Sequence, residues 1–231
     1  MWKHSGVHTK RDRANDVAEA ILLGKENTFA EDSVLASVFM KYITNPFCPA
    51  FIVAAKNPAP LMKTINKPRV VEAKINQVWM NYPRSLVVEA DGTATMDEAK
   101  FQDYLNLLKE CGKDALCEQQ RLATLMMLAE RQKNWSNYVA YLSEYLANPN
   151  LDMADLELCK KATLITRECK DMEVRTAAKQ LLDKRLDDLK SGRRQPQTQV
   201  GAMRISGNVD RILTMLSETL AKPCEPKAYK Q

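Results

Sequence analysis

Glycine is scarce in this chain, and its scarcity limits the fold class. Only 7 of the 231 residues are glycine. Phosphate-binding loops and the tight turns of β-rich folds depend on glycine, because it adopts positive φ without a steric penalty. Apolar residues make up 45% of the sequence, as in ordinary globular proteins with a core. The composition therefore favours a folded, helical chain.

Histidine is nearly absent, and no Cys-x-x-Cys pair occurs among the six cysteines. His4 and His8 have the spacing of a helical metal-ligand pair, but Gly6 lies between them and no carboxylate is near, so we predict no metal site and no cofactor. The commonest general base is missing from the rest of the chain, and we expect no catalytic residues. Cys111 and Cys117 flank a predicted turn, and a thiol redox role for them is the enzymatic alternative.

Long apolar runs are also missing. The longest, residues 51–55, is far shorter than the roughly 20 residues that span a bilayer. The first 13 residues lack the apolar segment of a signal peptide. As written, the sequence predicts a cytoplasmic protein without a membrane partner.

Positive charge is concentrated toward the C-terminus. Residues 160–231 carry 16 Lys and Arg against 9 Asp and Glu, whereas the whole chain has a net charge of +5. Nucleic-acid binding through this basic region is therefore a second alternative. Because the basic and acidic residues alternate at helical spacing, we interpret the region instead as a solvated helix face.

Hydrophobic spacing predicts helices through the first half of the chain. Residues 58–60, with two prolines, predict a break, and Pro83 is expected to end a helix. Thr95 and Glu98 have the spacing of a capping box. Asp91-Gly92 predicts a turn, and the segment 85–89 suits either a short strand or a continued helix. The expected helices cover residues 12–24, 32–43, 49–56, 69–82 and 95–112.

Two stretches of the second half read almost alike. NWSNYVAYLSEYLANP begins at Asn134 and NVDRILTMLSETLAKP begins at Asn208, and seven of sixteen positions are identical. Repeated amphipathic units bury their apolar faces by stacking on neighbours, as in tetratricopeptide arrays. We predict three helical hairpins whose second helices start near residues 134, 171 and 208. The hairpins pair residues 114–133 with 134–147, 152–168 with 171–190, and 197–205 with 208–222.

The order of these segments resembles a known family. SVLASVFMKYITNPFCPAFIVAAKN, INQVWMNYPRSLV, DEAKFQDYLNLLKECG and LAERQKNWSNYVAYLSEYL follow one another as in the helical region after the thioredoxin domain of exported Bacteroidetes-type bacterial thioredoxin-family proteins. The resemblance covers roughly residues 30–222. The family's redox centre is a Cys-x-x-Cys in the preceding domain, so none of its catalytic residues has a counterpart here. If the chain is a fragment of an exported parent, the resemblance implies the periplasm.

Aromatic and acidic residues supply the remaining candidates. Tyr138, Tyr141 and Tyr145 share one helix face, and Tyr138 and Tyr141 are expected to project as a partner-contact patch. The carboxylate pairs are expected to take only capping or exposed helical positions; they are Asp152 with Asp155, and Asp187 with Asp188.

The prediction is an all-α fold, an irregular helical array of about ten helices with tetratricopeptide-like hairpins. Its expected parts are a flexible tail over 1–11, a helical region over 12–112, hairpins over 113–222 and a second tail over 223–231. The predicted function is non-catalytic protein–protein interaction, with a protein or peptide partner and no small-molecule substrate.

Overall fold

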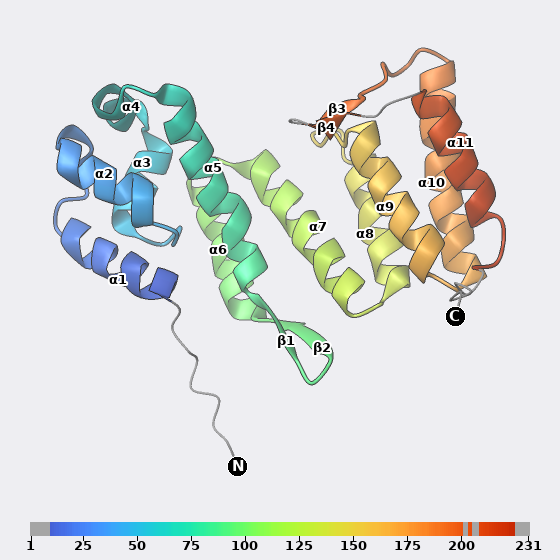
Figure 1. Cartoon of the computed structure of the whole chain (residues 1–231), viewed down its shortest axis with the longest axis horizontal. Helices are drawn as coiled ribbons and strands as arrows, with labels where there is room; N and C mark the ends of the chain where they lie inside the picture. Colours follow the sequence, from blue (N-terminus) through green and yellow to red (C-terminus); the bar gives the residue numbers. More distant parts are fainter. Residues whose placement is uncertain (1–9, 201–202, 205–207, 225–231) are drawn as a thin grey trace, which may run out of the picture. The chain divides into compact units, whose positions relative to one another are not determined.

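The computed structural model describes residues 10–200, 203–204 and 208–224, so most of both predicted tails lies outside the described part. Within that part the chain forms eleven α-helices, one 3-10 turn and two short β-hairpins. The predicted all-α class is confirmed. The chain divides into two compact units, Met1–Gln120 and Arg121–Gln231 (Figure 1). The division falls within α7 (Asp114–Arg131), eight residues beyond the boundary expected from the sequence.

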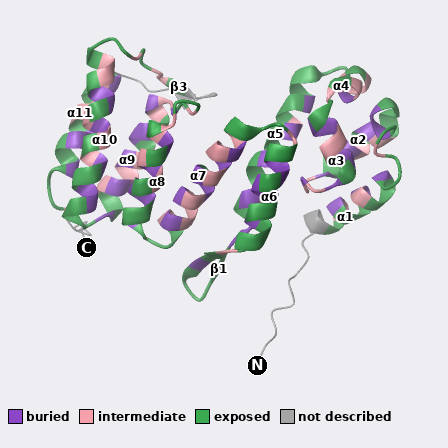
Figure 2. Cartoon of the chain, turned by 180° about the vertical axis from the view of Figure 1, so that it is seen from behind, coloured by how far each residue is buried: buried purple, intermediate pink, exposed green. Residues whose placement is uncertain are grey.

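The first unit contains six helices and one hairpin before α7. Their buried positions follow one side of each helix (Figure 2), as amphipathic spacing requires. The elements are α1 (Lys10–Leu22), η1 (Phe29–Glu31), α2 (Ser33–Tyr42), α3 (Pro49–Lys56), α4 (Ala59–Ile65), α5 (Pro68–Ser85), β1 (Val87–Ala90), β2 (Thr93–Met96) and α6 (Glu98–Glu110).

Three local predictions for this unit need correction. A break does separate α3 from α4 at residues 57–58, but it is followed by a helix that was not predicted. Pro60 lies in the first turn of α4, where a proline removes only an N–H that has no intrahelical partner. Pro83 lies inside α5 rather than ending it. The N-cap of α6 is Asp97, whose carboxylate accepts the Lys100 N–H at 3.1 Å, whereas Thr95 belongs to β2.

The ambiguous segment 85–89 divides between the two alternatives. Ser85 ends α5, and residues from Val87 onward pair in the antiparallel β1–β2 hairpin. Asp91 and Gly92 both have positive φ, 53° and 76°, which is the backbone of a tight two-residue hairpin turn. The predicted turn at this dipeptide is therefore confirmed.

An aromatic cluster forms the core of the first unit. Phe51 contacts Trp79 edge-on with ring centroids 4.8 Å apart, and Trp79 contacts Tyr104 at 6.1 Å. Pro83, four residues after Trp79, has no N–H to donate to the Trp79 carbonyl. The Tyr104 hydroxyl donates to that carbonyl at 2.7 Å instead. The helix is thus completed by a side chain from α6.

The second unit is built from the part of α7 that begins at Arg121 and from four further helices. They are α8 (Trp135–Ala147), α9 (Asp155–Glu168), α10 (Met172–Lys190) and α11 (Val209–Leu220). The starts of α8, α10 and α11 are separated by two steps of 37 residues, as the repeat predicts. Each follows an N-cap whose side chain accepts a backbone N–H; the caps are Asn134, Asp171 and Asn208.

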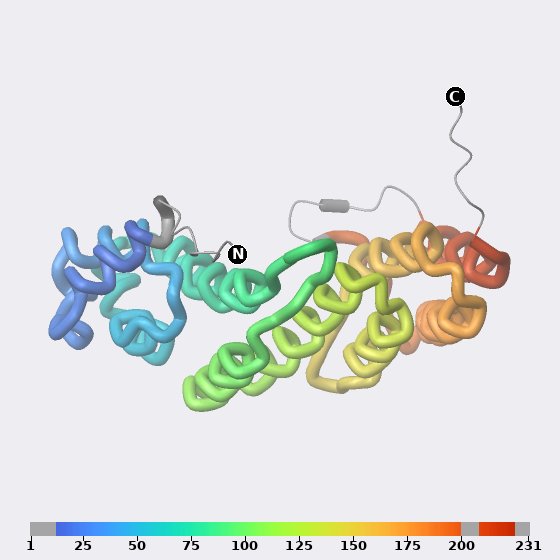
Figure 3. Tube along the Cα trace, turned by 90° about the horizontal axis from the view of Figure 1, so that it is seen from below, coloured from blue at the N-terminus to red at the C-terminus, as the bar shows by residue number. Residues whose placement is uncertain are grey.

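The third predicted hairpin is wrong in its first half. The segment expected as a helix over 197–205 instead contains two short strands, β3 (Gln199–Val200) and β4 (Met203–Arg204), which pair antiparallel. α11 packs against both α10 and α9, and the three helices lie side by side (Figure 1, Figure 3).

A fully buried arginine joins the ends of these three helices. Arg175 on α10 is only 1% exposed, and backbone carbonyls surround its guanidinium. Its Nη1 donates to the carbonyls of Thr166 and Cys169 at 3.1 and 3.0 Å. Its Nε and Nη2 donate to those of Lys222 and Thr219. The C-terminal ends of α9 and α11, where carbonyls lack helical partners, are therefore capped by one cation.

We expect Arg175→Ala to lower the free energy of unfolding by about 3–5 kcal/mol, because it leaves buried carbonyls without donors. Urea unfolding followed by circular dichroism measures the loss, and hydrogen exchange of peptides from α9 to α11 localises it. Arg211→Ala, at an exposed position of α11, is the matched control and should change stability by about 0.5 kcal/mol or less. Equal losses in the two variants would show that the buried guanidinium has no special role.

A double-mutant cycle tests the link between Pro83 and Tyr104. Tyr104→Phe alone should cost about 1–3 kcal/mol, because the buried Trp79 carbonyl loses its donor. In a Pro83→Ala background the new N–H at residue 83 can supply that bond, so the same substitution should cost clearly less. Urea unfolding of the four proteins measures the coupling; an additive cycle would contradict this account.

Candidate functional site

The three predicted contact tyrosines do not form a surface patch. Tyr138 and Tyr145 are 2% and 6% exposed and belong to the core of the second unit. Burial raises the pKa of Tyr138, and the Lys161 ammonium lies 6.0 Å from the centre of its ring. Tyr141 is half-buried against the same core. The expected projection of Tyr138 is therefore corrected, since its face of α8 packs inward against the hydrophobic cluster.

A groove lies instead on another face of α8, where α8 and α10 run beside one another. It has a volume of about 470 Å³. Small side chains on α8 leave the space open, because they recur at i, i+4 and i+7 and therefore share one face. These residues are Ser136, Ala140 and Ser143.

The facing wall of the groove comes from α10. Val174, Ala177 and Leu181 recur at i, i+3 and i+7 and give this wall an apolar surface. Val139 and Val174 are buried and form the floor, whereas Ala140 and Ala177 are exposed at the sides. The groove can therefore accept an apolar side chain without moving either helix.

One end of the groove is acidic. Asp171 and Glu173 line it there, and both side chains are exposed. The Asp171 carboxylate is already occupied by the N–H groups of Glu173 and Val174, at 2.8 and 3.3 Å, as the cap of α10. Glu173 is one position further along and adds a second negative charge. A ligand that carries a basic group beside an apolar one would therefore be complementary in charge to this end of the groove.

The acidic pair at the start of α9 differs from its prediction. Asp155 was expected at an exposed or capping position but is 0% exposed. Its carboxylate accepts Arg185 Nη1 at 2.6 Å and the Gln197 N–H at 2.7 Å, and Arg194 Nε lies 3.4 Å away. Arg194 also reaches Asp152 at 2.7 Å. These contacts hold the segment after α10 against the start of α9, which is a structural role.

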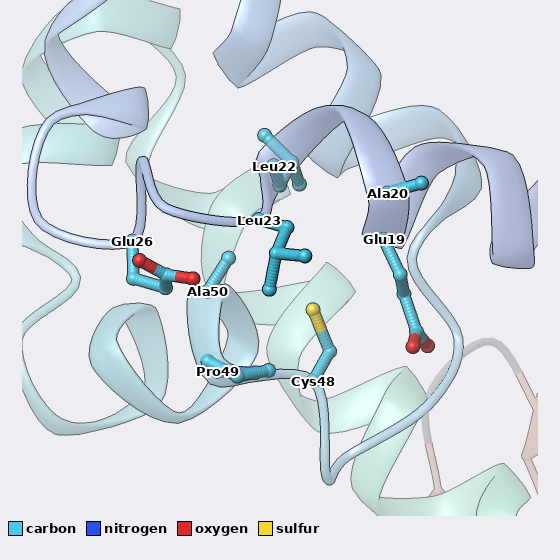
Figure 4. Close-up of a pocket in the computed structure, with 8 residues that line it drawn as sticks. All are labelled: Glu19, Ala20, Leu22, Leu23, Glu26, Cys48, Pro49 and Ala50. Atoms are coloured by element: carbon cyan, nitrogen blue, oxygen red, sulfur yellow. The ribbon is translucent and has the colours of Figure 1, made fainter.

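A second cavity, in the first unit, brings a thiol and two carboxylates together. It has a volume of about 200 Å³, and the carboxylates of Glu19 and Glu26 lie on either side of Cys48 (Figure 4). Burial, with smaller contributions from these carboxylates, raises the pKa of the Cys48 thiol. Glu19 accepts a bond from Asn15 and Glu26 from the Gly24 N–H, both at 2.7 Å. Burial and the neighbouring carboxylates therefore both disfavour the thiolate form of Cys48.

Cys111 and Cys117 have no features of a reactive pair. Cys117 is 1% exposed and its thiol donates to the Leu105 carbonyl at 3.5 Å. Burial raises the pKa of Cys111, whereas the catalytic thiol of a redox enzyme typically has a lowered pKa. Neither cysteine is part of a disulfide in the structure.

Several cations of the basic C-terminal region are buried or paired with carboxylates of the chain itself. Arg175 and Arg185 are buried, and Arg193 pairs with both Asp187 and Asp188. These cations are occupied by groups of the chain itself, so the residue count overstates the positive surface offered to nucleic acid.

Among the described residues there is no cluster of three or more His, Cys, Asp or Glu side chains placed to hold a metal ion. No described helix is long and apolar enough to cross a membrane. His4 and His8, for which no metal site is predicted, lie outside this part of the chain.

Comparison with known proteins identifies no relative. The chain matches no protein-family model, and no curated protein or solved structure is significantly similar to it. The groove between α8 and α10 was not found from the sequence, although the signal was present. That signal is the spacing of the small residues of α8, which share a different face of the helix from the tyrosines.

We expect Asp155→Ala to destabilise the second unit by about 3–5 kcal/mol, because Arg185 then stays buried without its carboxylate. Asp187→Ala is the matched control; this exposed partner of Arg193 should contribute about 1 kcal/mol or less. Urea unfolding measures both changes. Similar small losses in the two variants would contradict a structural role for the buried pair.

Proposed function

We propose that this chain is a non-catalytic protein–protein interaction module, and that the groove between α8 and α10 receives its partner. The observation that carries the proposal is the open volume of about 470 Å³ between two helices of one compact unit, lined by small and apolar residues. Helical arrays commonly bind peptides and helices in such grooves. The resemblance to the helical region of thioredoxin-family proteins supports the same class of function.

The occupant that fits is a peptide segment with an apolar anchor next to a Lys or Arg. The apolar side chain would enter between Ala140 and Ala177, over the floor formed by Val139 and Val174. The adjacent cation would lie by Glu173 at the acidic end. Burial of an anchor in a preformed groove supplies affinity, and the charge pair supplies orientation.

The two alternative functions have less support. A thiol redox role for Cys111 and Cys117 would need a depressed thiol pKa, and that of Cys111 is raised by burial. Nucleic-acid binding by residues 160–231 would need unpaired cations on one face, but Arg175, Arg185 and Arg193 are occupied within the unit.

The test selects random linear peptides displayed on phage against the full chain, and then titrates a selected synthetic peptide by calorimetry. We expect the selected peptides to share an apolar residue beside a Lys or Arg. Ala140→Arg and Ala177→Arg fill the groove from exposed wall positions, and each should weaken binding at least about tenfold, equivalent to about 1.4 kcal/mol. Glu173→Gln should weaken it about threefold and reduce its salt dependence.

Met215→Arg is the control, because it adds the same charge at an exposed position of α11 that does not line the groove. It should leave the affinity unchanged. If no peptide is enriched, or if the selected peptide binds the two groove variants as tightly as the original chain, the groove is not the contact surface. Circular dichroism of each variant confirms that the helices remain.

A further inference from the structure

Two cysteines far apart in the sequence lie at the same end of the second unit. Cys169 is the C-cap of α9, and Cys224 follows α11 by four residues. The Cys224 thiol donates to the carbonyl of Arg167 at 3.5 Å, only two residues before Cys169. α9 and α11 end on the same side of the group of helices (Figure 1). The fold therefore places Cys224 against the turn that contains Cys169.

Arg175 fixes this proximity. Its Nη1 donates to the carbonyl of Cys169 at 3.0 Å, and its Nε donates to the carbonyl of Lys222 at 2.9 Å. Both nitrogens belong to one planar guanidinium group. The backbone at residue 169 and the backbone at residue 222 are therefore held close together, on either side of that group. Cys224 is two residues beyond this anchored point. The chain at Cys224 is in neither a helix nor a strand, so its side chain can reorient without breaking a ladder.

The environments of the two thiols differ in a complementary way. Cys169 is fully buried, and its thiol faces the Asp171 carbonyl at 3.7 Å. Burial raises its pKa, with the Asp171 carboxylate and the Cys224 thiol acting in the same direction and Arg175 opposing them. Cys224 is partly exposed. A reagent in solution therefore reaches Cys224 more readily than Cys169.

We propose that Cys169 and Cys224 form a reversible disulfide that ties the C-terminal segment to the end of α9. The oxidant is a low-molecular-weight disulfide of the glutathione class. The Cys224 thiolate attacks one sulfur of the oxidant, forming a mixed disulfide and releasing one thiolate. The Cys169 thiolate then attacks the Cys224 sulfur and releases the second. The two protein thiols lose two electrons and two protons, and the S–S bond of the oxidant accepts the electrons.

The disulfide would close a loop of about 55 residues that includes α10 and α11. Cross-linking so long a loop restricts the unfolded chain strongly, and the melting temperature of the second unit should rise by roughly 10 °C. Cys169 is also two residues from Asp171, at the acidic end of the α8–α10 groove. The cross-link would therefore stiffen the chain beside that groove.

The experiment incubates the full chain with oxidised glutathione, alkylates the remaining thiols, and maps the digested peptides by mass spectrometry. A Cys169–Cys224 linkage is expected as the main product, with the loss of two hydrogen atoms and an increased melting temperature that a reductant reverses. Cys224→Ser should abolish both effects. Cys111→Ser, which removes a partly exposed thiol of the first unit, should leave both intact.

Three outcomes would overturn the proposal: a stable glutathione adduct on Cys224 without ring closure, a main linkage between other cysteines, or complete alkylation of both thiols. Cys224→Ser replaces a partly exposed side chain and keeps a donor for the Arg167 carbonyl, so we expect this variant to fold. It therefore serves as the test even if Cys169→Ser, at a fully buried position, is unstable. The readout is independent of any peptide bound in the groove, so it separates this proposal from the proposed function.

Discussion

The buried guanidinium of Arg175 is the constraint on which the second unit depends. An arginine cannot lose its charge inside a protein, so the surrounding fold must supply acceptors for its donors. Here the acceptors are backbone carbonyls at the C-terminal ends of α9 and α11, where helix dipoles concentrate negative potential. The relative placement of three helices is thereby tied to a single side chain. The same contact brings the chain beyond α11 next to the end of α9.

At the opposite end of this unit the buried charge is a carboxylate, and its partners are arginines. Asp155 is buried at the start of α9 and is neutralised by Arg185 on α10 and by Arg194 beyond it. Buried polar contacts of this kind discriminate among helix arrangements, because an alternative packing leaves a charge unpaired. With both ends of α9 and α10 fixed in this way, the apolar cluster fills the interior between them. The groove between α8 and α10 is the surface that this packing leaves open.

Sequence patterns predicted the helices where local chemistry was decisive. Asn134, Asp171 and Asn208 are strong capping residues, and the helices that follow them start where the 37-residue spacing indicates. Sequence patterns were not sufficient where one residue type occurs in two different structural settings. Proline is typical of a helix end, yet Pro60 lies in the first turn of α4 and Pro83 lies within α5. Pro83 has no N–H for the Trp79 carbonyl, and the Tyr104 hydroxyl donates to that carbonyl instead. Tyrosines at helical spacing suit either a surface or a core, and tertiary packing chose the core for Tyr138.

The sequence by itself determined the all-α class, most helix boundaries and the repeated starts of α8, α10 and α11, because these depend on contacts within a few residues of one another. Tertiary structure alone decided which charges are buried, where the groove opens and which cysteines lie at the same end of the unit. Arg175 with Lys222, Asp155 with Arg185, and Cys169 with Cys224 are each separated by 30 residues or more. No local pattern encodes such pairs, since they form only when packing of the apolar faces brings distant segments together.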